Sequence, residues 1–115
     1  MSNILVEETR YELTGIVVVT LWHGQRGYAR VKILTDEKGI EEIIKNPRQD
    51  YLSFGVKSVD YVEFYVYTIK VRETENKIIT ERSKKPDYLI ADGEYKLTPK
   101  EEEELFESEE IIVHY

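Results

Sequence analysis

Hydrophobic and polar positions alternate with a period of two along several stretches of the chain, which predicts a protein built mainly from β-strands. The stretch 11–22 is rich in β-branched residues and places apolar or small side chains at every second position, so we expect a strand with one buried face. The stretch 28–35 alternates most regularly, and the loop 23–27, which contains two glycines, joins the two as a hairpin. A short edge strand is predicted at 4–6.

The stretch 59–71 is predicted to be one long strand inside the sheet. Val62, Phe64 and Val66 share one face, and the opposite face bears aromatic side chains. The more apolar face therefore changes partway along the strand. Either a β-bulge near Tyr67 shifts the register by one residue, or the strand is covered on both faces. The aromatic residues of the second face are Tyr61, Tyr65 and Tyr67.

Two short helices are predicted where the period changes. Over 37–45 isoleucines recur at the spacing of one helical face, and Pro47 blocks continuation. Over 99–107 the pair Thr98 and Glu101 forms a capping box, with proline at the first helical position. The isoleucines of the first helix are Ile40, Ile43 and Ile44.

The second half of the chain adds short strands. These are predicted at 77–82, 88–91, 94–97 and 111–113. The dipeptide Asp92-Gly93 is a strong signal for a two-residue hairpin turn between the second and third of them. We therefore predict a single α+β domain over 1–115, with a mostly antiparallel, mostly meandering sheet of five to seven strands and two short helices.

Composition restricts the class of protein. The chain of 115 residues is 41% hydrophobic, which suffices for one ordinary core. It has no cysteine, which excludes disulfides, thiolate nucleophiles and cysteine metal sites. The N-terminus lacks the pattern of a signal peptide, and the longest apolar run, 16–19, is far too short to span a membrane, so we expect a cytoplasmic protein without membrane contact. Abundant Glu and Lys with a single Met are typical of hyperthermophile proteins and also of mesophile proteins with charged surfaces.

The protein is acidic, and its net charge of −7 has a local origin. Residues 101–110 contain seven acids and no base, so the rest of the chain is formally neutral. Such a segment can bind a basic partner or imitate the charge of nucleic acid, or it can be a solvated helix face. Conversely, residues 13–35 contain no acid.

The hairpin within that acid-free stretch is a candidate site for nucleic acid. Basic groups beside aromatic rings can hold phosphates and stack on bases, and loops on rigid strands often carry function. The alternative is an ordinary exposed hairpin, because three basic residues make a small electrostatic footprint. The candidate nucleic-acid-binding residues are Trp22, His23, Arg26, Tyr28 and Arg30.

A second candidate lies at Pro86-Asp87 followed by Glu94-Tyr95-Lys96. This pattern resembles the Pro-Asp…(Asp/Glu)-x-Lys signature of restriction-endonuclease-like nucleases. The resemblance implies that Asp87 and Glu94 bind Mg²⁺ and that Lys96 orients or activates a water. If Asp92-Gly93 is the turn of a hairpin, the two carboxylates stand roughly 13 Å apart along the ladder, which is too far for one metal.

The third candidate is the tyrosine set of the long strand. Nine tyrosines are many for a chain of this length, and aromatic side chains with a polar tip are enriched at interfaces. Alternatively, the helix at 37–45 covers this face. His23 and His114 lie far apart in sequence and lack ligand spacing, and there is no phosphate loop, nucleophile elbow or triad pattern. We therefore expect a module that is not an enzyme and needs no cofactor, and that binds a protein partner or itself through Tyr61, Tyr65 and Tyr67 or through a sheet edge.

Overall fold

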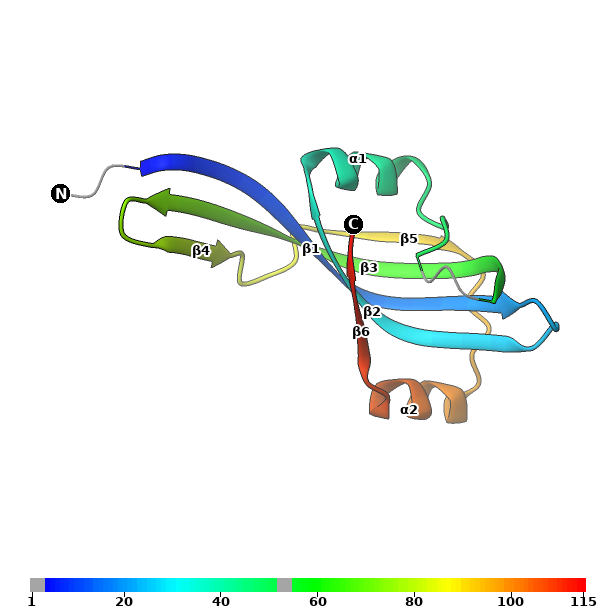
Figure 1. Cartoon of the computed structure of the whole chain (residues 1–115). Coiled ribbons are helices and arrows are strands. Elements are labelled where there is room, and N and C mark those ends of the chain that lie inside the picture. Colours follow the sequence, from blue (N-terminus) through cyan, green and yellow to red (C-terminus); the bar gives the residue numbers. More distant parts are fainter. Residues whose placement is uncertain (1–3, 52–54) are drawn as a thin grey trace.

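A computed structural model describes residues 4–51 and 55–115 of the chain (Figure 1). The elements follow one another in the order β1 (Ile4–Leu21), β2 (Arg26–Asp36), α1 (Glu37–Lys45), β3 (Val56–Thr74), β4 (Ile78–Arg82), β5 (Tyr88–Gly93), α2 (Pro99–Glu107) and β6 (Glu110–His114).

All six strands belong to one mixed sheet, with the order β4-β3-β1-β2-β6. The strand β5 pairs with the same edge of β3 as β4 does, but nearer the start of β3. Every pairing is antiparallel except that of β2 with β6. The predicted α+β class and strand number are confirmed, but the meander is wrong: β3 returns to the far side of β1 instead of lying beside β2. The predicted strands 4–6 and 11–22 are a single strand, β1.

Both helices form where the sequence predicts them. The Asp36 carboxylate accepts a hydrogen bond from the Gly39 N–H at 2.9 Å, and Thr98 with Glu101 closes a capping box. Position 39 requires glycine because a Cβ there would lie 1.7 Å from the Thr35 hydroxyl oxygen. The helix α1 therefore lies close against the end of β2.

The two helices cover opposite faces of the sheet (Figure 1). We call these the α1-side face and the α2-side face. The main core lies between the sheet and α1, where the Tyr51 ring packs edge-on against Phe64 with centroids 5.7 Å apart. Among the described residues, three buried hydrophobic side chains lie outside this core, Ile16, Val18 and Leu105, and Leu105 belongs to α2. The main core consists of Leu13, Val17, Val19, Val31, Ile33, Ile40, Ile43, Tyr51, Val62, Phe64, Val66 and Ile90.

Part of the sheet projects from the body as an arm (Figure 1). We define the arm as residues 4–10 of β1, 69–74 of β3 and all of β4. It begins where β1 stops pairing with β2, at Arg10 opposite Asp36, and where the pairing of β5 with β3 ends, at Val66 opposite Tyr88. The arm gives the molecule extents of 58 × 25 × 23 Å.

The more apolar face of β3 changes along the strand because β3 passes from the body, where helices cover the sheet, into the arm. The pairing of β3 with β1 is continuous through Tyr67, so the interpretation of a bulge near Tyr67 is wrong. The register shifts instead at Asp60, because Val18 pairs with Tyr61 while Val19 pairs with Val59. In the body, each face of the sheet has a helix on it, and beyond Val66 β3 runs into the arm, where the described residues place no helix (Figure 1).

The predicted hairpin at Asp92-Gly93 is also wrong. The strand β5 runs to Gly93 and pairs with β3, with Val62 opposite Asp92, and residues 94–98 form no strand. Gly93 has a φ of 101°, and a Cβ there would lie 2.0 Å from the Asp60 carbonyl oxygen. The glycine is therefore needed for its positive φ and for the close approach of the β3 backbone at Asp60, rather than for a two-residue turn.

Candidate interaction surface

The three candidate tyrosines all lie on the α2-side face of β3. They occupy alternate positions opposite the face of Val62, Phe64 and Val66, which belongs to the main core beneath α1. The alternative that α1 covers the tyrosines is therefore wrong. Within the sheet, Tyr61 pairs with Gly93 and Tyr65 with Leu89 of β5, and all three tyrosines pair with β1 on their other side.

The tyrosines differ in how far other side chains cover them. The Tyr61 ring meets the Tyr95 ring edge-on, with centroids 5.2 Å apart. The Tyr67 ring lies under the Arg82 guanidinium, 4.4 Å from the ring centroid. Tyr65 is 44% exposed, and its cross-strand neighbour Leu89 is 49% exposed. The centre of the tyrosine row is therefore an open apolar patch.

Burial raises the pKa of the Tyr61 phenol, and the negative charge of Glu63 raises it further. The Tyr61 hydroxyl donates to the Glu63 carboxylate at 3.3 Å. This tyrosine is thus held as a neutral donor within the α2-side face.

A charged cluster joins the arm to the body on the same face. Glu12 is only 8% exposed, and its carboxylate lies 2.5 Å from the Arg82 guanidinium and 3.9 Å from the Lys32 ammonium. Lys32 also lies 3.5 Å from Glu110 of β6. The buried carboxylate is compensated by two cations, as a buried charge requires.

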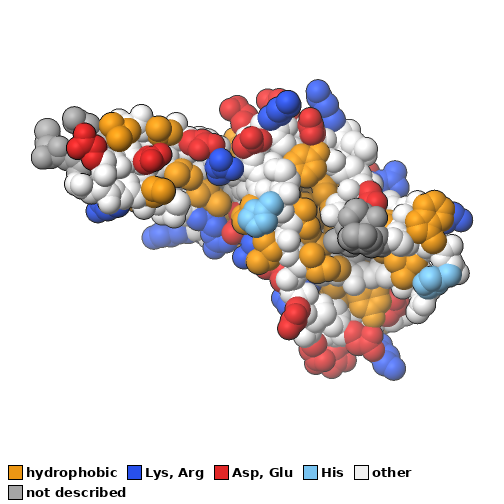
Figure 2. Space-filling view, viewed as in Figure 1, with side chains coloured by type: hydrophobic (Ala, Val, Ile, Leu, Met, Phe, Trp, Pro, Cys, Tyr) orange, Lys and Arg blue, Asp and Glu red, His pale blue; other side chains and the backbone are white. Residues whose placement is uncertain are grey.

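The arm itself exposes large apolar side chains, which Figure 2 shows among charged ones. Its strand edges are unpaired within the described residues: β1 pairs with β2 only from Arg10 onward, and β4 pairs with β3 alone. Unpaired edges with apolar side chains are sites where another chain can add. The exposed aliphatic residues of the arm are Ile4, Leu5, Val6, Ile78 and Ile79.

The basic hairpin faces the acidic segment of the same chain. Arg26 donates to the Lys96 carbonyl and lies 3.4 Å from Glu101. The Tyr28 hydroxyl donates to Glu104 at 2.6 Å, and this hydrogen bond raises the pKa of Tyr28. Of the seven acids in residues 101–110, Glu101 and Glu104 thus contact side chains of β2 in the same chain.

The remaining hairpin candidates divide into an engaged residue and two exposed ones. Arg30 donates to the Ser108 carbonyl at the end of α2. Trp22 is 69% exposed at the hairpin end, and His23 is exposed beside it. The arrangement leaves the two arginines occupied, which disfavours them as free phosphate ligands.

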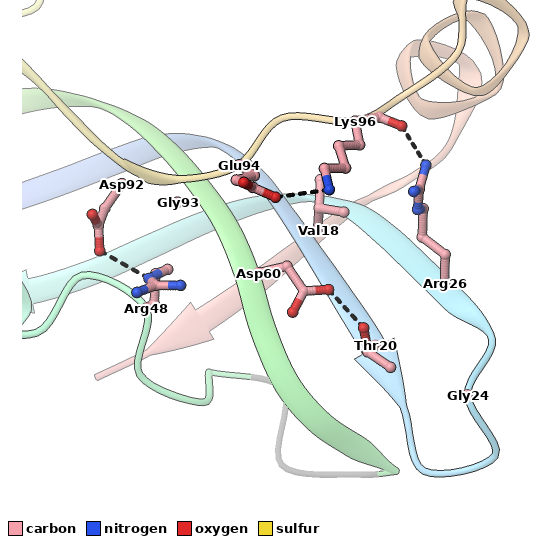
Figure 3. Close-up of a pocket in the computed structure, with 10 residues that line it drawn as sticks. All are labelled: Val18, Thr20, Gly24, Arg26, Arg48, Asp60, Asp92, Gly93, Glu94 and Lys96. Carbon is pink, nitrogen blue, oxygen red and sulfur yellow. Dashed lines mark hydrogen bonds and ion pairs between the residues drawn. The ribbon is translucent and has the colours of Figure 1, made fainter.

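A polar cavity of about 840 Å³ lies between the hairpin end, the start of β3 and the segment after β5 (Figure 3). Figure 3 shows its charged groups as neighbouring pairs: Arg48 with Asp92 at 2.9 Å and Lys96 with Glu94 at 2.8 Å. The Asp60 carboxylate accepts from the Thr20 hydroxyl at 2.7 Å. Two of the lining carboxylates are thus paired with cations, whereas Asp60 accepts hydrogen bonds from the hydroxyls of Thr20 and Ser58. Its lining residues are Val18, Thr20, Gly24, Arg26, Arg48, Asp60, Asp92, Gly93, Glu94 and Lys96.

The structure separates the carboxylates of the nuclease-like pattern. Asp87 accepts from the Thr68 hydroxyl at one end of β5, and Glu94 follows the other end. Seven residues of extended chain place them about 23 Å apart. The Lys96 ammonium, which donates to Glu94, holds the pKa of that carboxyl below its usual range. Within residues 4–51 and 55–115, no three His, Asp or Glu side chains gather as metal ligands, and His114 lies in β6 away from the hairpin of His23.

Leu89, Tyr95 and Arg82 complete the surface around the tyrosines and were absent from the sequence-based site. Leu89 was not predicted because the expected hairpin paired residues 88–91 with residues 94–97, whereas β5 pairs with β3. Tyr95 contacts Tyr61 from 34 positions later in the chain, and Arg82 contacts Tyr67 from 15 positions later. No local sequence pattern predicts contacts over such separations.

No helix within the described residues has the length and apolar character needed to cross a membrane. Comparison with protein-family models, with curated proteins and with solved structures gives no match to this chain.

Proposed function

We propose that this chain is a non-enzymatic interaction module that binds protein, either a partner or a second copy, through the α2-side face of β3. The single observation behind this proposal is the open patch of Tyr65 and Leu89, which are 44% and 49% exposed on neighbouring strands. Paired aromatic and aliphatic side chains on a rigid sheet lose little conformational entropy on binding.

The surroundings of the patch support the same function. Tyr67 continues the row toward the arm, and β3 carries the face onward through Ile69 and Val71. The apolar stripe therefore extends from the body onto a projecting ribbon. A ribbon of three strands gains stability when a further layer covers its apolar face.

Sedimentation velocity over a concentration series of the purified protein tests the proposal. We expect the average mass to rise with concentration, and we expect Tyr65→Ser combined with Leu89→Ser to reduce that rise. These side chains are exposed, so the substitutions should leave the fold intact.

Trp22→Ser serves as the matched control, because this aromatic side chain is more exposed than Tyr65 but lies at the hairpin end. It should leave the mass curve unchanged. A mass that stays at 13.6 kDa at all concentrations would contradict self-association. A rise that Tyr65→Ser with Leu89→Ser does not alter would move the interaction to another surface.

A further inference from the structure

We infer that the partner of this surface is a second copy of the chain, and that the two copies stack their arms face to face in antiparallel orientation. The inference rests on the proposed function and specifies its occupant and register. Its starting point is that the two faces of the arm differ in chemistry.

On the α2-side face of the arm, the middle strand carries Ile69 and Val71 and then, nearer the tip, Glu73. Ile69 and Val71 alternate there with residues of the other face, and Val71 is flanked by Glu8 on one side and Thr80 on the other. At the tip of the same face, the exposed Glu73 lies between Val6 and Ile78. The opposite face carries mostly charged or polar residues: Glu7, Thr9, Lys70, Arg72, Ile79 and Glu81.

Along β1, the charges on the α2-side face of the arm are arranged in a self-complementary way. Glu8 lies toward the tip and Arg10 toward the body, on the same face of β1. A two-fold axis that crosses the arm between them places Glu8 of each copy over Arg10 of the other. The same axis places Val71 of each copy over Ile69 of the other, so the apolar centre is buried while both ion pairs form at its rim.

This register reaches the tyrosine row at Tyr67. The row of Val6 and Glu73 in each arm lies over the row of Glu12 and Tyr67 in the second copy, because it is two residues beyond Glu8 as theirs is two residues beyond Arg10. A partner of unrelated sequence would not have its charges placed by the same axis. The second copy therefore fits the arm without any further assumption about its chemistry.

The size of the contact sets its strength. Four rows across three strands cover about 23 by 14 Å, roughly 320 Å² of flat area on each copy. Such a contact belongs to the small, transient class of interfaces, so we expect a dimer that dissociates on dilution. The measurement therefore has to span about 10 to 500 micromolar protein at low ionic strength.

A charge-swap experiment on the full chain tests the register. In a dimer of Glu8→Arg, the positive charge introduced at position 8 of each copy lies over Arg10 of the other copy. In a dimer of Arg10→Glu, the negative charge introduced at position 10 of each copy lies under Glu8 of the other copy. Each single variant should therefore associate about tenfold or more weakly than the wild type. Mixing the two variants in equal amounts restores both ion pairs across the interface, so the mass of the mixture should return toward the wild-type value.

The intramolecular contact of Glu8 with Arg10, at 3.0 Å between exposed side chains, contributes little to folding, so the variants should stay folded. Circular dichroism checks this, and Glu8→Gln with Arg10→Gln provides a milder loss of both pairs. Glu7→Arg and Arg72→Glu are the matched controls, because this exposed pair lies on the opposite face of the arm. Neither control should change the mass.

Failure of the mixture to regain mass, or single variants that associate like the wild type, would overturn the inference. If Tyr65→Ser with Leu89→Ser still lowers the mass in that case, the proposed function stands with a different geometry. A wild-type protein that stays monomeric over the whole series overturns both forms of self-association.

Discussion

The guanidinium of Arg82 lies 2.5 Å from the carboxylate of Glu12 and, at the same time, 4.4 Å from the ring centroid of Tyr67. Arg82 ends the last strand of the arm, whereas Glu12 and Tyr67 belong to the start of the body. This contact fixes the direction of the arm. It also covers the Tyr67 ring at the junction between the two parts.

We predict that Arg82→Ala loosens the arm without unfolding the body. The substitution leaves the Glu12 carboxylate with only Lys32 as a cation, and we estimate a local cost of about 1–2 kcal/mol because the arginine is half exposed. Hydrogen exchange should speed up in β4 and leave the core of Val62 and Phe64 protected. Equal acceleration in the core would contradict this account of the junction.

Gly15→Ala should be among the most destabilising small substitutions in the chain. A Cβ at position 15 would lie 1.6 Å from the Glu63 carbonyl oxygen, in the interior pairing of β1 with β3. We expect a loss of about 2–4 kcal/mol in the free energy of unfolding, measured by urea denaturation. Gly24→Ala is the control, because its φ of 88° causes strain but no atom lies within 4 Å of the added methyl. A smaller loss for Gly15→Ala than for Gly24→Ala would contradict the prediction.

Alkaline pH should release one tether of α2. The hydrogen bond to Glu102 raises the pKa of Tyr95 from 10.0 to about 12. The folded state therefore keeps a proton that the unfolded state loses, so this contribution to stability is complete below pH 10.0 and disappears as pH rises through about 12. The difference in unfolding midpoint between wild type and Tyr95→Phe should shrink over that interval. A difference that stays constant with pH would show that the hydrogen bond does not support the fold.

Replacing Arg26 and Arg30 by alanine should lower stability rather than abolish binding of nucleic acid. Both side chains donate to backbone carbonyls around α2, so we expect a cost of about 1–2 kcal/mol in thermal or chemical unfolding. Arg48→Ala, which removes an exposed arginine paired with Asp92, is the control and should cost less. In a salt titration, wild-type binding of RNA or DNA that the double variant loses would contradict this prediction and support the hairpin as a nucleic-acid site.

The sequence predicts the local elements well and their pairing poorly. Both helices begin and end as expected, because caps and helical spacing are written within a few residues, as at Thr98 and Glu101. The return of β3 to the far edge of β1 has no local signal, and neither has the parallel pairing of β6. Strand pairing depends on distant contacts that a period of two does not specify.

The tyrosine face illustrates the same limit at the candidate site. Alternation along β3 correctly places Tyr61, Tyr65 and Tyr67 on one face. Alternation does not say which helix covers which face, so it could not exclude the alternative, now shown to be wrong, that α1 lies over the tyrosines. The acidic segment and the basic hairpin each suggested an external partner in isolation, and only the fold shows that they contact each other.

A photo-crosslinking residue in place of Tyr65 tests the central claim most directly. On irradiation of the purified protein, we predict a covalent dimer whose yield rises with concentration and falls when Leu89 is replaced by Ser. The same residue in place of Trp22 should give only monomer. Monomer alone from position 65, or equal dimer from both positions, would contradict the claim that two copies associate through the α2-side face of β3.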